Sequence, residues 1–466
     1  MSNERRQARP RITPGVRFLL SVASVVLLLF LSGFAFRYCL GLFVLGDEYL
    51  IRLPGANPIA EKIPDSDANA GSDSVVQTGR ATILAVGDLM PHLPVLRAGW
   101  NGQNYNFEYM FQYVKPYISA ADYAVVNLET TFSGADGLKY TGSPKYNAPD
   151  AVATGAYATG FDLMLTGNNR CYDHGTAGLL RTLETIKSSG MDTLGTVSAV
   201  EESKYIVQQI NGIRIGMINY TFAEIAEDRN HPTIDGTPVD SKAAGLVNVF
   251  DYDMLDVFYT EMEDHISAMR ASGAEAIVLF IHWGDKFSNK SNSAQQEIAQ
   301  QMCDLGVDVI AGSHPNVVQP ITLLTSTDGT NKTLCLYSMG NFLSNQRSDN
   351  VGVESGHTED GLMFSFTFVK YSNGEVHVES IDLIPTWTLI RGTGDNRTYY
   401  VLPLDVSVED WNTVYAMNGD QAAAANKSLE RTNGLIYTAQ KEVKATLQQQ
   451  NEERSQLLGT ITGGIG

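Results

Sequence analysis

The sequence is poor in cysteine, and its four cysteines follow neither the CxxC spacing of a zinc ribbon nor the dense pattern of a disulfide framework. The chain also has no internal repeat and is short of positive charge, with 33 Lys and Arg against 52 Asp and Glu, a net charge of -19. Residues 1–37 hold six arginines and one glutamate, a net of +5, which leaves -24 on the remaining chain. An acidic body of this kind excludes nucleic acid as an expected partner.

Residues 18–36 form a nearly unbroken apolar stretch whose 19 residues, at about 1.5 Å each, reach roughly 28 Å, enough to cross a bilayer. A cleaved signal peptide shares the basic start, but this apolar core is longer and no small-x-small cleavage site follows it. Five arginines precede the stretch, and the positive-inside rule places residues 1–17 in the cytoplasm. We therefore expect a single-pass protein of the cell membrane whose main domain is extracytoplasmic.

Three further predictions concern how the chain is divided. Residues 37–80 are predicted to be a flexible extracytoplasmic linker, because the stretch from Pro54 to Arg80 is rich in Pro, Ala, Asp, Ser and Gly and cannot bury enough apolar surface to fold. Residues 81–405 are predicted to be the folded domain. Residues 406–466 are predicted to be a helical extension with a flexible tail, since 420–450 is rich in Ala, Gln, Lys and Glu.

Helix-like and strand-like patterns alternate along the folded domain, which predicts an α/β fold with a largely parallel core. Two stretches break the alternation, because each has apolar runs on both sides of an Asn-Gly pair, a strong hairpin signal: Asn211-Gly212 and Asn373-Gly374. The result is a predicted mixed sandwich with helices outside. The clearest elements are helices at 107–120, 177–189 and 295–305 and strands at 275–281 and 307–311.

Six short apolar runs, read as buried strands, each end in a polar cluster. In open α/β sheets the carboxyl ends of the strands line the ligand crevice, so these clusters are expected to converge. They combine carboxylate, amide and imidazole, the mixture that binds calcium or first-row divalent metals, although a cap, a turn former or a satisfied polar group explains any one of them alone. The clusters are Gly87-Asp88, Asn127-Leu128-Glu129, Gly167-Asn168-Asn169, His282-Trp283-Gly284-Asp285, Gly312-Ser313-His314 and Met339-Gly340-Asn341.

Together with the stretches GFDLMLTGNNRCYDHG and AGSHPNVVQP, these motifs resemble, in type and order, the CapA/PgsA family of capsule-type poly-gamma-glutamate biosynthesis proteins over about residues 81–345. That family is similar to calcineurin-type metallophosphoesterases, which implies a two-sheet sandwich flanked by helices (α-β-β-α). It also implies a divalent metal site of up to two ions, Mn, Fe or Zn. The residues so assigned are Asp88, Glu129, Asn169, His282, His314 and Asn316 as metal ligands, with Asn341 in the substrate-binding set.

Two departures from the family pattern bear on activity. Arg170 stands where the family has a histidine, and arginine cannot transfer protons although it grips phosphate or carboxylate well. Asn316 replaces a second histidine and weakens a metal ligand. The candidate catalytic residues are Arg170, Asp173 and His174, with His174 or Asp285 as the proton carrier.

Two residues complete the predicted substrate-binding set. Trp283 adjoins His282 and offers a stacking platform for a sugar, although core packing is the commoner role of such a tryptophan. Lys145 lies in a loop rich in Pro and Gly, where solvated lysines are also common.

The resemblance implies a membrane-anchored protein in the synthesis, export or processing of an anionic cell-surface polymer, poly-gamma-glutamate above all. Two alternatives remain open. One is a metal-dependent hydrolase of an envelope phosphodiester or glycan, and the other is a non-catalytic partner of the subunits of a membrane polymer synthase.

Overall fold

The computed structural model describes residues 75–135, 138–225, 232–351 and 356–463, with side chains up to residue 454 in the last helix. Residues 72–466 belong to one compact unit. No helix within the described ranges is both long and apolar enough to cross a membrane. The predicted cytoplasmic segment 1–17, the predicted span 18–36 and most of the predicted linker 37–80 lie outside the described residues.

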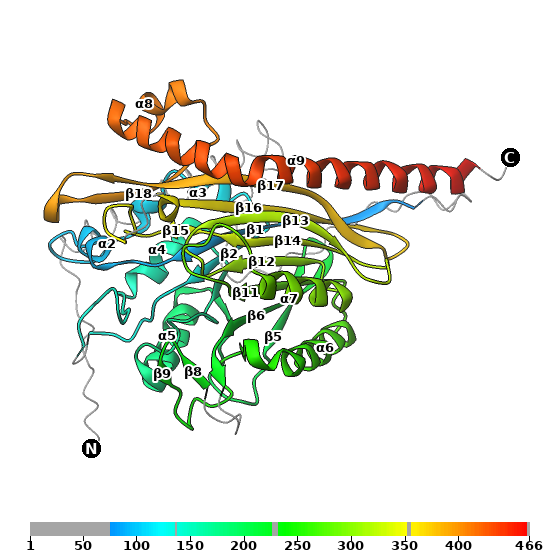
Figure 1. The fold of residues 1–466 in the computed structure, drawn as a ribbon, viewed down its shortest axis with the longest axis horizontal. Helices are drawn as coiled ribbons and strands as arrows, with labels where there is room; N and C mark the ends of the chain where they lie inside the picture. Colours follow the sequence, from blue (N-terminus) through cyan, green and yellow to red (C-terminus); the bar gives the residue numbers. More distant parts are fainter. Residues whose placement is uncertain (1–74, 136–137, 226–231, 352–355, 464–466) are drawn as a thin grey trace, which may run out of the picture. The chain divides into compact units, whose positions relative to one another are not determined.

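The first sheet is built around β1 (Gln77–Leu89). Strands β2, β3 and β4 continue it in parallel on one side, and β16, β17 and β18 continue it antiparallel on the other (Figure 1). A short strand, β15, pairs in parallel with the end of β1. The bounds are Tyr123–Leu128 for β2, Leu163–Leu165 for β3, Asp192–Leu194 for β4, Asn341–Leu343 for β15, Asp360–Tyr371 for β16, Val376–Arg391 for β17 and Thr398–Pro403 for β18.

The second sheet has the order β10-β6-β11-β12-β14-β13, with β5 paired to β6. Its strands are parallel except for β5 and β13, which run antiparallel to their partners. A small third sheet contains β7, β8 and β9. The bounds are Tyr205–Ile210 for β5, Ile213–Phe222 for β6, Glu224–Ile225 for β7, Pro232–Ile234 for β8, Thr237–Pro238 for β9, Val249–Phe250 for β10, Ala276–His282 for β11, Val309–Ser313 for β12, Val318–Thr325 for β13 and Lys332–Met339 for β14.

Helices cover the outer faces of both sheets. The outer face of the first sheet packs on α2, η2, α3 and α4, and that of the second on α6 and α7. The bounds are Leu93–Ala98 for α2, Lys115–Ile118 for α3, Ala151–Thr159 for α4, Gly175–Ser189 for α5, Leu255–Ala271 for α6, Ser293–Asp304 for α7, Trp411–Val414 for α8 and Gly419–Gly463 for α9. Short 3-10 helices are η2 (Glu108–Phe111), η3 (Tyr252–Met254), η4 (His357–Glu359), η5 (Gly394–Asn396) and η6 (Val408–Asp410).

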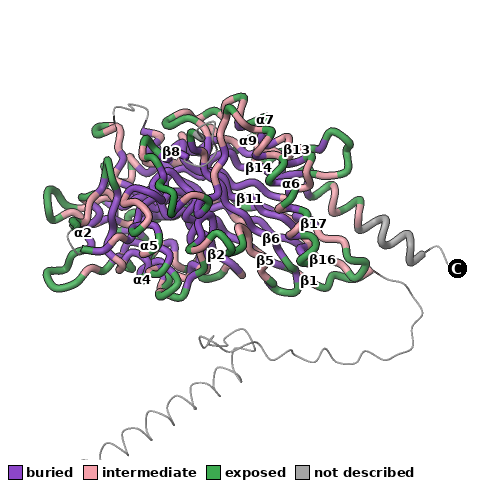
Figure 2. Tube along the Cα trace, turned by 90° about the horizontal axis from the view of Figure 1, so that it is seen from below, coloured by how far each residue is buried: buried purple, intermediate pink, exposed green. Residues whose placement is uncertain are grey.

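The central strands contain long apolar runs, because both of their faces are buried there. In β1, Ile83 and Ala85 point into the layer between the two sheets, while Leu84 and Val86 pack under the helices. The strands therefore appear as a continuous buried centre (Figure 2). This arrangement is the predicted sandwich of two sheets between layers of helices.

Local predictions have mixed outcomes. Both Asn-Gly pairs form the predicted hairpins, β5–β6 and β16–β17, and Asn211 takes the left-handed conformation that its turn requires, with φ of 44°. The helix predicted over 107–120 is instead broken into η2 and α3. The break has a physical cause, because Pro116 is tolerated in the first turn of α3 but not in the interior of a longer helix.

The helix predicted over 420–450 forms the amino-terminal two thirds of α9, which lies along β17 and β13, one strand from each sheet (Figure 1). Ile436, Val443 and Leu447 of α9 are buried and join the core between the sheets. The helix is therefore an integral part of the packed structure.

Candidate functional site

The predicted site residues meet where strands of both sheets end. The register of the parallel pairs places Asp88 beside Asn127 in the first sheet and His282 beside Ser313 in the second. The polar side chains of the two groups described next are more than nine-tenths buried. The strand ends therefore converge as the sequence predicts, and they form two hydrogen-bonded groups.

The first, called here the carboxylate–amide group, contains Asp88, Asn127, Asn168 and Asn316. The two carboxylate oxygens of Asp88 accept hydrogen bonds from Nδ2 of Asn127 at 2.7 Å and from Nδ2 of Asn316 at 3.1 Å. Asn168 Nδ2 in turn donates to Asn127 Oδ1 at 3.2 Å. Burial raises the pKa of Asp88 to about 6, and the two amide donors oppose this rise. The group holds one carboxylate in a fixed frame of amides.

The orientation of Asn316 bears on its predicted role. Its nitrogen faces Asp88, while its Oδ1 accepts from Gln346 Nε2 at 3.3 Å. In this orientation the amide nitrogen faces Asp88, so Asn316 would have to turn its amide over to act as a metal ligand beside Asp88. Asn341, predicted to bind substrate, uses its own Nδ2 to hold the carbonyl oxygens of Asn316 and Thr358 at 3.2 and 2.9 Å. Both residues position their neighbours.

The second, called here the imidazole group, contains His282, His314, Asn169 and Ser313. His282 Nε2 lies 2.9 Å from Asn169 Oδ1 and 3.0 Å from His314 Nδ1, and His282 Nδ1 lies 2.8 Å from Ser313 Oγ. Burial lowers the pKa of His314 to about 3 and that of His282 well below its usual value. Both imidazoles are therefore neutral at pH 7 and free to act as ligands or hydrogen-bond partners.

The backbone of His314 is strained. Its φ of 97° is a conformation that residues with a Cβ atom rarely adopt, and the ring is held edge-on against Phe222 with 4.8 Å between centroids. Strain of this kind is retained where surrounding structure enforces it, and it is commonest at functional sites. Here it directs the imidazole toward His282.

Glu129, which directly follows β2, lies at the same edge of the sheets, and its carboxylate is buried. Its Oε2 is buried with no hydrogen-bond partner among the described residues. Burial, followed by the nearby charge of Asp88, raises the pKa of Glu129 well above its usual value, and Arg170 and Lys286 oppose the rise. An unpartnered carboxylate oxygen is costly to bury and so needs a functional explanation.

Arg170 is tied to its surroundings on several sides. Its Nη1 donates to Pro144 O at 3.0 Å and to Asp235 Oδ2 at 2.6 Å, and lies 3.5 Å from Asp173 Oδ1. The guanidinium also stacks over Tyr146, whose backbone N–H donates to Asp173. Burial raises the pKa of Asp173 to about 6. Arg170 is therefore a fixed positive charge, which leaves proton transfer to other groups.

Among the predicted catalytic residues, His174 has a ring nitrogen without a hydrogen-bond partner within the part of the chain that the structure describes, and Arg170 has an Nε that is likewise unpartnered there. His174 precedes α5 and is partly buried, and Nε2 is its unpartnered nitrogen. Burial, with a smaller effect of Lys145, lowers its pKa. Lys145 itself is exposed on the loop beside Pro144, where it can reach a ligand.

The prediction that Trp283 binds substrate is wrong. Its side chain is 0% exposed, and its indole N–H donates to Tyr337 O at 2.9 Å within the core of the second sheet. A fully buried ring offers no face to a sugar. The alternative role, core packing, is the one that the structure shows.

Sequence reasoning missed Asp235 and Lys286. Asp235 lies in the turn between β8 and β9, where it binds Arg170 and accepts a long hydrogen bond of 3.5 Å from Asn169. Lys286 Nζ lies 3.8 Å from the Asp235 carboxylate. The signals were the Asp235-Gly236 turn pair and the position of Lys286 directly after the polar cluster that ends β11.

The carboxylate and imidazole side chains at this edge could hold a first-row divalent ion only together with amide oxygens. Within the described ranges, no group of three or more His, Cys, Asp and Glu side chains is placed to hold a metal ion. The donor atoms of the imidazole group lie 2.9 and 3.0 Å apart, which are hydrogen-bond distances and also about the separation of adjacent ligands that lie about 2.1 Å from one octahedrally coordinated ion. His282, His314 and Asn169 are the residues that fit.

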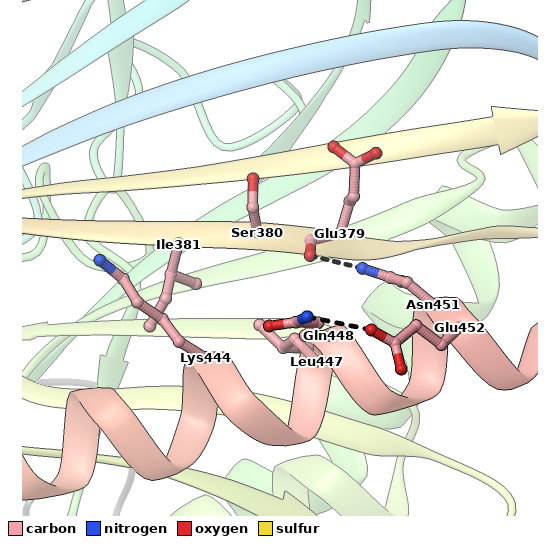
Figure 3. Close-up of a pocket in the computed structure, with 8 residues that line it drawn as sticks. All are labelled: Glu379, Ser380, Ile381, Lys444, Leu447, Gln448, Asn451 and Glu452. Atoms are coloured by element: carbon pink, nitrogen blue, oxygen red, sulfur yellow. Dashed lines mark hydrogen bonds between the residues drawn. The ribbon is translucent and has the colours of Figure 1, made fainter.

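A separate groove of about 750 Å³ lies between β17 and α9, where Asn451 Nδ2 donates to Glu379 O at 2.9 Å (Figure 3). It is lined by Glu379, Ser380, Ile381, Lys444, Leu447, Gln448, Asn451 and Glu452. None of the predicted site residues is among them. We therefore place the candidate chemistry at the strand ends, where titratable groups converge.

Comparison with solved structures gives a distant likeness. The structure of a hypothetical protein from Thermus thermophilus is 13% identical, covers 65% of this chain and 98% of that chain, and has a TM-score of 0.36.

Comparison with known sequences identifies the family. The chain is 27% identical over 271 residues to capsule biosynthesis protein CapA of Bacillus anthracis, covering 57% of this chain and 60% of that protein. It is 25% identical over 280 residues to PGA biosynthesis protein CapA of Bacillus subtilis (strain 168), covering 59% and 65%. The chain thus spans less than two thirds of these relatives. Residues 82–346, more than half of the chain, match the family model of the bacterial capsule synthesis protein PGA_cap. The chain therefore belongs to the bacterial capsule synthesis protein PGA_cap family.

Proposed function

We propose that this protein takes part in the synthesis, export or processing of a poly-gamma-glutamate capsule and that it engages the polymer at the strand-end site. Two relatives are named for capsule or PGA biosynthesis, and the family match contains every residue of both hydrogen-bonded groups. The observation that carries the proposal is the convergence of buried carboxylate, amide and imidazole groups from both sheets at one edge.

Basic side chains at the site would allow this acidic protein to bind an anionic polymer. Arg170 and Lys286 lie at the site, and Lys145 is exposed on the adjoining loop. Arginine presents a planar fork that suits carboxylates, and lysine adds a mobile point charge. We assign these three residues to binding the carboxylates of the polymer.

We also propose a divalent ion, Mn, Fe or Zn, held by His282, His314 and Asn169, with Glu129 as the nearby carboxylate. When bound, such an ion polarises a carboxyl or phosphoryl oxygen and lowers the pKa of water. The protein groups supply the rest: Asp88 is held in its amide frame, Arg170 orients the anion, and His174 offers an unpartnered nitrogen for a proton.

The unpartnered nitrogen of His174 favours a second candidate function, metal-dependent hydrolysis of the polymer or of an envelope phosphodiester. Without turnover, the same site would serve a non-catalytic subunit that holds the polymer for a membrane synthase. Incubation of the protein with poly-gamma-glutamate, followed by size-exclusion chromatography, separates the two, because only the hydrolase shortens the polymer.

The principal test is the metal content of the full-length protein, measured by elemental analysis. We expect about one equivalent of Mn, Fe or Zn in the wild type and its loss from the double variant His282→Ala, His314→Ala. His265→Ala is the matched control, since His265 lies on α6 outside both groups. Equal metal content in all three proteins would contradict the metal site.

Polymer binding is tested separately by calorimetry with poly-gamma-glutamate. The double variant Arg170→Gln, Lys286→Gln is expected to bind at least tenfold more weakly, because two charge-assisted contacts are lost. Lys444→Gln, on the exposed side of α9, is the control. Binding that is unchanged in the double variant would place the polymer elsewhere.

We further propose that residues 18–36 anchor the protein in the cell membrane, with the amino terminus in the cytoplasm. Externally added protease should then digest the folded domain in intact spheroplasts and spare an amino-terminal tag. Co-purification with membrane polymer-synthase subunits would support the partner proposal. Release of the protein by alkaline carbonate would contradict the anchor.

A further inference from the structure

The family match ends at residue 346, yet the chain continues through three strands and α9. A buried carboxylate joins α9 to this later part of the chain. Asp360, at the start of β16, is 1% exposed, and its Oδ1 accepts hydrogen bonds of 2.6 Å from Ser428 Oγ and from Arg431 Nη2. Arg431 Nε donates to its other oxygen at 3.0 Å. Arg431 thus makes a two-point contact, the strongest geometry for a guanidinium and a carboxylate.

The same arginine also fixes the segment that precedes Asp360. Its Nη2 donates to Gly356 O at 3.1 Å, at the start of η4. Arg431 therefore holds both ends of residues 356–360. Thr358, in the middle of this segment, is fully buried, and its carbonyl oxygen accepts from Asn341 Nδ2 at 2.9 Å.

The contact between this segment and β15 is close enough to exclude side chains. Gly340 and Gly361 form an antiparallel bridge, and a Cβ atom at Gly361 would lie 2.1 Å from Asn341 O. A Cβ atom at Gly340 would lie 2.6 Å from Asp360 O. Because the two backbones are in direct contact, a shift of residues 356–360 would also displace Asn341.

From Asn341 the hydrogen bonds lead into the candidate site. Asn341 Nδ2 donates to Asn316 O at 3.2 Å, and Asn316 Nδ2 donates to Asp88 Oδ2 at 3.1 Å. Gln346 closes the network, since it accepts from Asn341 at 3.0 Å and donates to Asn316 at 3.3 Å. An unbroken chain of contacts therefore joins α9 to the Asp88 carboxylate.

We propose that Arg431 of α9 is a positioning residue for the strand-end site, acting through Asp360, Asn341 and Asn316 on Asp88. The helix beyond the family match thereby completes the frame of the site within it. The inference deepens the proposed function and rests on it for the identity of the site. The coupling itself is measurable without any ligand.

Hydrogen–deuterium exchange of the full-length protein, followed by mass spectrometry, tests the coupling. Arg431→Met is expected to speed exchange roughly tenfold in peptides covering 356–361 and also in those covering 312–318 and 338–346. Peptides from β5 and α6, which lie outside the chain of contacts, report any general loss of stability and are expected to stay at wild-type rates. Lys444→Met removes an exposed ion pair from the same helix and is the matched control.

Arg431→Met leaves the buried Asp360 carboxylate without its ion-pair partner, which is enough to unfold some proteins. Two milder variants therefore keep the test decisive if Arg431→Met does not fold. Arg431→Lys keeps the charge and is expected to restore most of the protection, and Ser428→Ala removes one hydrogen bond to Asp360 with a smaller effect in the same peptides. Faster exchange confined to α9 and 356–361 in these variants would overturn the proposal. An exchange result in its favour together with no metal and no polymer binding would instead refute the proposed function alone.

Discussion

The carboxylate–amide group and the imidazole group lie at the same buried edge but differ in how they are satisfied. Each oxygen of Asp88 meets an amide donor, and Asn168 and Gln346 extend that frame outward. His282 and His314 instead bring two neutral rings to within 3.0 Å of each other, on a backbone strained at His314. The first group satisfies a buried carboxylate with amide donors, whereas the second holds His314 in a strained backbone conformation beside His282. Variants of each group should therefore affect stability differently.

Asp88→Leu is expected to have the largest effect. It leaves the amides of Asn127 and Asn316 without their acceptor, and unpaired buried donors cost about 1–3 kcal/mol each. We expect the free energy of unfolding, measured in urea, to fall by about 4 kcal/mol. Asp88→Asn keeps the shape and one acceptor oxygen and should lose less than half as much. Equal losses in the two variants would show that the amide frame depends on shape alone.

The two groups should respond to pH in opposite directions. The pKa of Asp88 is raised from 3.8 to about 6 in the folded protein, so the folded state takes up a proton first and stability rises as pH falls from 7 toward 4. The pKa of His314 is lowered from 6.5 to about 3, so only the unfolded state takes up a proton and stability falls below pH 6.5.

The measurement is urea unfolding of metal-free protein at pH 7 and pH 5. The His314 contribution lost over this range is about 2 kcal/mol, and the Asp88 gain is about 1 kcal/mol. Relative to the wild type, His314→Gln should therefore lose less stability on acidification, and Asp88→Asn should lose more. Parallel behaviour of the two variants would refute the contrast.

A smaller effect should reveal the strain at His314. Because φ is 97°, a glycine at this position removes a steric penalty that alanine retains. His314→Gly is expected to be about 1 kcal/mol more stable than His314→Ala in thermal or urea unfolding. At Ser313, whose backbone is extended in β12, the same pair should show the reverse order. Alanine more stable than glycine at 314 would mean that the backbone is unstrained.

The smallest effect is expected at Lys286, whose charge acts on the imidazole group and on Glu129. Its side chain is 38% exposed and its ion pair with Asp235 is 3.8 Å long, so Lys286→Met should change stability by less than about 0.5 kcal/mol. Polymer binding should weaken all the same. A loss of stability above about 1 kcal/mol would assign Lys286 to the fold instead.

The sequence was sufficient to predict which strand ends meet, because apolar runs buried on both faces end abruptly in polar residues. It could not show which atom of Asn316 faces Asp88, since that depends on Gln346 and a left-handed backbone. Trp283 was misassigned because successive residues after a strand can point to opposite sides.

Two further features depend on tertiary contacts that no local pattern reveals. Asp235 reaches Arg170 from a separate small sheet, and its own sequence context indicates no more than a turn. The polar composition of α9 predicts a helix, and the apolar residues that pack on the core, Ile436, Ala439, Val443 and Leu447, recur at helical spacing, but this spacing cannot show that the helix lies against both sheets.

The order in which the site residues occur along the chain has a consequence for biogenesis. Asp88 is synthesised early, whereas Asn316, Asn341 and finally Arg431 follow much later. Contacts this distant in sequence form slowly, and a domain of this size folds through intermediates. A nascent or truncated chain can therefore present the amino-terminal half of the site but never the whole of it. On the proposed function, engagement of the polymer would begin only when α9 has docked, so molecules in which α9 has not yet been synthesised would not act on the capsule.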